Sequence, residues 1–147
     1  MPYHARLLVL TVAILVVSIP GFTQVADHFD TSRTVTVTGV AARLQIGTVR
    51  TMIVLRAEDE AGMEQRWVVE ANGMAALTRD GWPERMGLGP GTVLTVTALP
   101  LRPTAAIDEV LAGAPEEYLE AARAGRFVRG LEATLADGTT RPLGSTD

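Results

Sequence analysis

The chain contains no cysteine. This absence excludes disulfides, thiol nucleophiles and cysteine-ligated metals, although it leaves the redox compartment open. Lysine is absent too, and all thirteen Lys or Arg positions are arginine. Exclusive use of arginine favours a bacterium with high-GC coding. Aromatic residues make up only 5% of the chain, so the two tryptophans are the large aromatic candidates for a binding surface.

The sequence shows no motif for catalysis or for a cofactor. It has no serine elbow, phosphate-binding loop or dinucleotide fingerprint. His28 is the only histidine beyond the N-terminal segment, and with Asp27 and Asp30 it falls short of a specific transition-metal site. We therefore predict a non-enzymatic protein with no cofactor and no metal site.

The charge balance disfavours nucleic acid as a partner. All 17 acidic residues and all but one of the arginines follow Ala26, which leaves an excess of negative charge. Binding to phosphates needs clustered positive charge, whereas these acids and arginines are interleaved.

Residues 1–26 are predicted to be a signal peptide or an N-terminal membrane anchor. Arg6 precedes the uncharged, mostly apolar run Leu7–Ile19, which is the plan of a secretory signal. Alternatively, residues 7–25 approach the ~20 residues needed to span a bilayer and stay attached. In both cases residues 27–147 are expected in the periplasm, either soluble or anchored to the inner membrane.

The remainder is predicted to be one mainly β domain. Segments rich in β-branched residues or alternating in polarity predict strands, and these are residues 34–46, 50–58, 65–71, 92–99 and 127–135. Residues 73–79 predict a short helix after the third strand. We expect a small five-stranded OB-like barrel, with a compact β-sandwich as the alternative.

Other features of the domain are predicted from glycine, proline and turn signals. Residues 100–126 form a helical insertion of two short pieces before the last strand. Gly39 marks an expected bulge or bend in the first strand. After the turn at Asp137-Gly138, the tail to Asp147 is expected to be loose.

The chain resembles a family of small exported bacterial proteins of unknown function. The resemblance runs from about His28 to Pro100 and resumes more weakly over the last strand. It rests on an ordered set of residues: His28-Phe29-Asp30, Val35–Val40, Asp59, Gly62, Trp67, Glu70, Leu77, Gly81-Trp82, Leu88, Pro90-Gly91 and Val93–Val96. It implies an OB-like barrel and export, with no established activity. Relatives usually carry Asn-Pro-His where this chain has Thr48-Val49-Arg50.

Four residues are candidates for ligand binding. Trp67 and Trp82 offer aromatic faces that stack bases or sugars when exposed, although packing against the core or capping the barrel is the alternative for both. Glu70, if buried, needs an arginine such as Arg43, Arg50 or Arg56. Arg50 also stands where relatives have histidine.

The helical insertion supplies a candidate partner surface. Its apolar residues form a patch if they are exposed, and otherwise they pack on the barrel. These residues are Val110, Leu111, Tyr118, Leu119 and Phe127.

Two functions of different classes follow from the sequence. The first is an accessory module outside the cytoplasm that binds a protein partner, with a membrane complex as one possibility. The second is a periplasmic protein that binds a small ligand or an oligosaccharide.

Overall fold

The computed structural model describes residues 28–89 and 91–145. The predicted signal peptide or anchor, residues 1–26, lies outside these residues. Within the part of the chain that the structure describes, no helix is long and apolar enough to cross a membrane.

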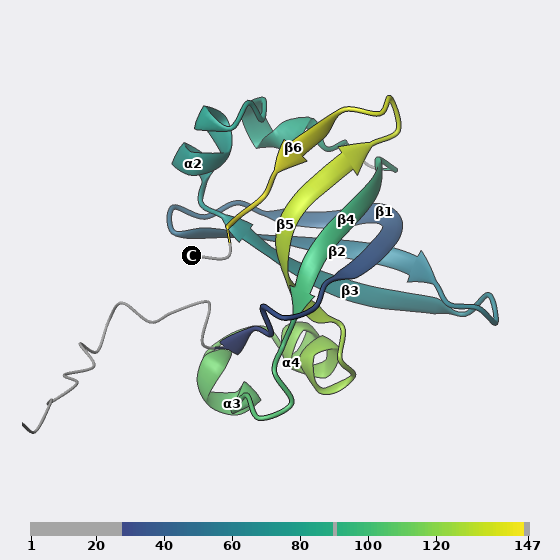
Figure 1. Ribbon diagram of the computed structural model, residues 1–147, viewed down its shortest axis with the longest axis vertical. Helices are drawn as coiled ribbons and strands as arrows, with labels where there is room; N and C mark the ends of the chain where they lie inside the picture. The colour runs from purple at the N-terminus through teal and green to yellow at the C-terminus, as the bar shows by residue number, and fades with distance from the viewer. Residues whose placement is uncertain (1–27, 90, 146–147) are drawn as a thin grey trace, which may run out of the picture.

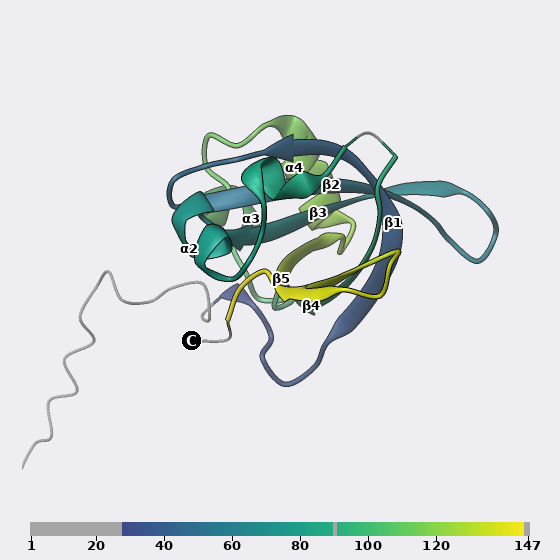
Figure 2. The same cartoon turned by 90° about the horizontal axis from the view of Figure 1, so that it is seen from above.

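The main body is a closed five-stranded barrel, which confirms the predicted fold (Figures 1 and 2). Neighbouring strands pair antiparallel in the order β3-β2-β1-β4-β5, and a parallel pairing of β3 with β5 closes the ring. This is the connectivity of an OB-like barrel. The strands are β1 (Val35–Gln45), β2 (Arg50–Glu58), β3 (Glu64–Asn72), β4 (Val93–Pro100) and β5 (Phe127–Leu135).

Alternation along the strands builds two cores, one on each side of the sheet. Ile53 and Leu55 on β2 belong to the main core with Val69 on β3. Their neighbours Val54 and Val68 belong to a second core, because successive side chains of a strand point to opposite faces. Both faces of these strands are therefore buried where the helices cover the barrel.

The helices sit at opposite ends of the barrel (Figure 1). At one end lie α2 (Met74–Arg79) and the 3₁₀ turn η1 (Glu84–Gly87). At the other end lie α3 (Ile107–Val110) and α4 (Glu116–Arg123), which form the predicted insertion between β4 and β5. Buried apolar residues of α4 and its approach, including Leu111 and Tyr118, complete the second core.

The bulge in β1 lies next to Ala42 and not at Gly39. The pairing of β1 with β2 shifts between Ala41 and Arg43. Gly39 keeps regular pairing and serves another purpose, because a Cβ at this position would lie 2.7 Å from the backbone oxygen of Arg56. Glycine here allows close approach of two backbones.

The C-terminal tail is ordered through Leu143, so the expectation of a loose tail is wrong for this part. Residues Thr140–Pro142 form a sixth strand, β6, which pairs with β5. The next residue, Leu143, is completely buried in the main core, and its backbone oxygen accepts a hydrogen bond from the backbone N–H of Asn72 at 2.7 Å. The tail therefore covers the part of the barrel where β3 meets β5.

Candidate functional site

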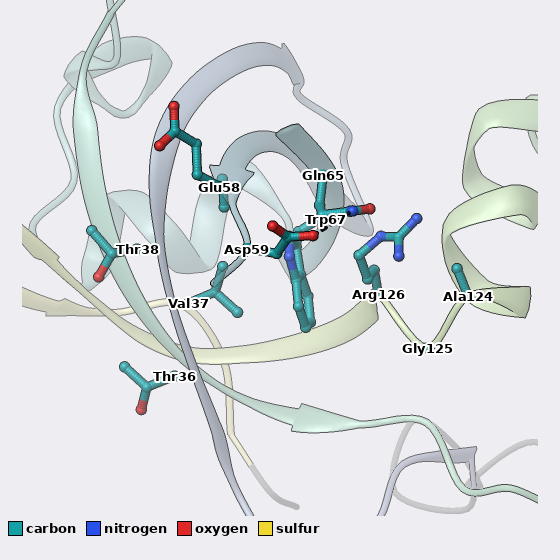
Figure 3. Close-up of a pocket in the computed structure, with 11 residues that line it drawn as sticks. Thr36, Val37, Thr38, Glu58, Asp59, Gln65, Trp67, Ala124, Gly125 and Arg126 are labelled. Atoms are coloured by element: carbon teal, nitrogen blue, oxygen red, sulfur yellow. Dashed lines mark hydrogen bonds between the residues drawn. The ribbon is translucent and has the colours of Figure 1, made fainter. Parts of the chain in front are cut away.

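A cleft of about 460 Å³ opens at the rim of the barrel beside the β2–β3 hairpin (Figure 3). Its volume lies within the range of small-molecule sites. Three segments distant in sequence contribute to it: the start of β1, the base of the hairpin, and the connection from α4 to β5. The lining residues are Thr36, Val37, Thr38, Ala57, Glu58, Asp59, Gln65, Trp67, Ala124, Gly125 and Arg126.

Trp67 forms the aromatic wall of this cleft. It shares a face of β3 with Val69 and packs against the main core while remaining partly exposed. Figure 3 shows its ring between Val37 and Arg126. The packing interpretation of Trp67 therefore holds for the part of the side chain that contacts the main core, while the rest of the side chain remains accessible in the cleft.

Asp59 is fixed in place by the hairpin turn. Its Oδ1 accepts hydrogen bonds from the backbone N–H groups of Ala61 and Met63, both at 2.9 Å. Its Oδ2 accepts one from Gln65 Nε2 at 3.2 Å. The Met63 N–H, and then Gln65, hold the pKa of the Asp59 carboxyl below its usual value. Asp59 is therefore a fixed anion that accepts hydrogen bonds.

Arg126 supplies the cationic side of the cleft. It follows the left-handed turn at Gly125, and its Nε donates to the backbone oxygen of Arg66 at 3.1 Å. This bond holds the base of the guanidinium beside Trp67. Sequence reasoning missed Arg126, Asp59 and Gln65 as site residues.

Glu70 lies away from this cleft, on the same face of β3 as Val68, and is 3% exposed. Its Oε1 lies 3.6 Å from Arg50 Nη1 and 3.7 Å from Arg129 Nη1. The requirement for an arginine partner is met by Arg50, one of the predicted candidates, and by Arg129, which was not predicted. Arg43 instead pairs with Glu117.

Arg129 is itself buried, at 6% exposure. Its Nη2 donates to Asn72 Oδ1 at 2.6 Å. Burial lowers the pKa of its guanidinium, and Arg50 adds to this effect. Arg129 Nε and Glu70 Oε1 form no hydrogen bond with any described group. Glu70 and Arg129 therefore form a buried ion pair in which some polar atoms lack a hydrogen bond from the described residues.

Trp82 is a packing residue. It is 2% exposed within the main core, and its Nε1–H donates to the backbone oxygen of Pro142 at 2.6 Å. The Arg141 guanidinium lies 5.8 Å from the ring centre. Trp82 thus holds β6 against the end of the barrel, as the capping alternative described, and offers no free face to a ligand.

The apolar residues of the insertion pack on the barrel and do not form a free patch. Leu111, Tyr118 and Phe127 are buried, while Val110 and Leu119 are partly buried against the same core. Two arginines of the barrel also reach α4, because Arg43 and Arg66 both pair with Glu117. Packing is therefore the alternative that the structure shows for this set.

The fold and the cleft define a small OB-like barrel with an aromatic site at its rim. Residues 13–108 match the Family of unknown function (DUF6152), and the chain therefore belongs to that family. The match includes β1 to β4 and ends within α3, so α4 and β5 lie beyond it. No curated protein and no solved structure matches the chain.

Proposed function

We propose that the protein is a non-enzymatic binding module outside the cytoplasm and that its rim cleft binds a saccharide. The observation that carries this proposal is the partly exposed face of Trp67 in a cleft surrounded by polar side chains. A sugar ring has an apolar C–H face that packs on an aromatic ring, and hydroxyls at its edge that need donors and acceptors.

The polar groups around Trp67 suit such hydroxyls. The Gln65 side-chain amide both donates and accepts hydrogen bonds, a carboxylate only accepts, and a guanidinium only donates. The Thr38 hydroxyl does not count among these groups, because it is hydrogen-bonded to Thr95 on β4. The Asp59 carboxylate faces the single guanidinium of Arg126 on the lining, whereas the Glu58 carboxylate points away from Trp67 (Figure 3). This balance favours a neutral polyhydroxylated ligand over a phosphate-rich one.

The hydrogen bonds of Asp59 favour binding over acid–base catalysis. A general acid or base works best with a pKa near the operating pH, whereas the turn lowers the pKa of Asp59. Its backbone and Gln65 donors also keep it in one position. These properties suit a group that orients a ligand without exchanging a proton with it.

Titration with soluble oligosaccharides of glucose, N-acetylglucosamine and galacturonate tests the proposal. In a Trp82→Phe background, Trp67 is the single tryptophan, so its fluorescence reports on the cleft. We expect one saccharide class to shift the emission and raise the Tm. Trp67→Ala, measured by calorimetry, is expected to weaken binding by about 5- to 150-fold, since stacking on an aromatic ring contributes roughly 1–3 kcal/mol.

The matched control is Val93→Ala, which alters an exposed apolar residue outside the cleft and should leave the affinity unchanged. Circular dichroism shows whether each variant is folded. Failure of all three saccharides to bind at millimolar concentration would reject the proposal. Equal affinity of a folded Trp67→Ala variant would also reject it.

A protein partner is the second candidate function. The β2–β3 hairpin extends beyond the barrel (Figures 1 and 2) and leaves Met63 63% exposed next to its turn. We expect a tagged full-length chain, purified in mild detergent from its own membranes, to retain a stoichiometric partner. A Met63→Ser variant should lose that partner. Recovery of an unaccompanied monomer under the same conditions would contradict this function.

A further inference from the structure

A second cleft, of about 330 Å³, lies between the β1–β2 turn and the helical insertion. Apolar side chains from both sides line it, namely Met52 from β2 and Val110, Leu111, Ala114 and Pro115 from the insertion. It shares no lining residue with the Trp67 cleft. It is therefore a separate site, and its volume falls within the range of small-molecule pockets.

Arg50 brings a positive charge to this apolar cleft. Its side chain is 47% exposed, and it lines the cleft next to Met52. On the other side of the cleft, the Tyr118 hydroxyl donates to Gln45 Oε1 at 2.6 Å. The cleft therefore combines apolar walls with one cation, Arg50, and one neutral hydrogen-bonded pair, Tyr118 and Gln45.

The charge of Arg50 is not fully compensated by the protein. Arg50 and Arg129 both approach the same oxygen, Glu70 Oε1, at 3.6 and 3.7 Å. These distances exceed those of a good charge-assisted hydrogen bond. One carboxylate facing two guanidiniums leaves a net charge of about +1 in a partly buried place, where charge is costly. A single added anion on Arg50 balances the cluster.

We propose that this second cleft binds a small monocarboxylate with an aliphatic or aromatic tail. The carboxylate pairs with the Arg50 guanidinium, whose planar fork matches two carboxylate oxygens. The tail lies between Met52 and the insertion residues Val110, Leu111 and Ala114. The Glu70 carboxylate behind Arg50 disfavours a dianion, so one negative charge is preferred.

Calorimetric titration of the full-length chain with 4-phenylbutyrate tests this proposal, with 4-phenylbutanamide as the neutral analogue. We expect the acid to bind at least tenfold more tightly than the amide. Arg50→Gln should remove this preference, and Arg50→Lys should retain part of it. The matched control is Arg56→Gln, an exposed arginine on the same strand that does not line the cleft, which should bind like the natural chain.

A second variant tests the tail site while keeping Arg50. Ala114→Phe places a ring in the cleft and should weaken binding of the acid at least tenfold. Trp67→Ala should leave it unchanged, which separates this site from the proposed saccharide site. Equal binding of acid and amide would overturn the proposal. So would full binding by a folded Arg50→Gln variant, or binding that is lost in Trp67→Ala.

Discussion

Replacing Glu70 with leucine is expected to lower the free energy of unfolding by about 3–5 kcal/mol. The change leaves Arg129 buried without its counter-charge, and removal of one partner of a buried ion pair has a cost of this size. Total stabilities are about 5–15 kcal/mol, so the loss is large. Urea unfolding followed by circular dichroism measures it.

The double variant Glu70→Leu/Arg129→Met separates the charge from the packing. With both charges removed, no buried charge is left without its counter-charge, and stability should return toward that of the natural chain. Recovery should stop short of the full value, because Asn72 Oδ1 loses its donor. The exposed Glu58→Leu is the matched control and should change stability by at most about 0.5 kcal/mol. A double variant no more stable than Glu70→Leu alone would contradict the expected role of the charge.

Trp82→Ala is expected to lower the free energy of unfolding by about 3–5 kcal/mol, the usual range for truncating a buried aromatic residue. The ring is 2% exposed, and its N–H holds Pro142. Trp82→Phe keeps most of the packing and loses this hydrogen bond, so a smaller cost is expected. Guanidinium unfolding compares the two variants.

The partly exposed Trp67 gives the matched comparison. Because it retains contact with solvent, Trp67→Ala should destabilise the protein less than Trp82→Ala does. The two tryptophans thus have opposite expected profiles, with stability dominating at Trp82 and ligand affinity at Trp67. If both substitutions had the same effect on stability, the assignment of Trp82 as the packing residue would be wrong.

The strands of the barrel were predictable because each has its own local signal. Alternation in Val35–Val40 predicts one strand, and the apolar run Met52–Leu55 predicts another that is buried on both faces. Both patterns depend only on neighbouring residues. The strand β6 has no such signal, since Thr140–Pro142 is only three residues long and ends in proline. Its position is fixed by pairing with β5 and by burial of Leu143, which are contacts distant in sequence.

The candidate sites were predictable only in part, for the same reason. Trp67 was identified by its residue type, and the need of a buried Glu70 for arginine was correct. Arg129 could not be identified as a partner of Glu70, because the two are brought together only by the parallel pairing of β3 with β5. Arg126 reaches Trp67 only because β5 begins beside β3 (Figure 3). Hairpin spacing does bring Asp59 near Gln65, so this pair could have been found from the sequence.

The parallel pairing that closes the barrel has a consequence for the order of folding. Three residue pairs join β3 to β5, whereas nine join β2 to β3. A hairpin closes a short loop, while the β3–β5 pairs must first bring together segments with β4 and the insertion between them. We expect this junction to form last and to open first. The backbone N–H of Val68 donates to the backbone oxygen of Arg126 at this junction. Amide hydrogen exchange should therefore be faster at Val68 than at Ile53 in the middle of β2.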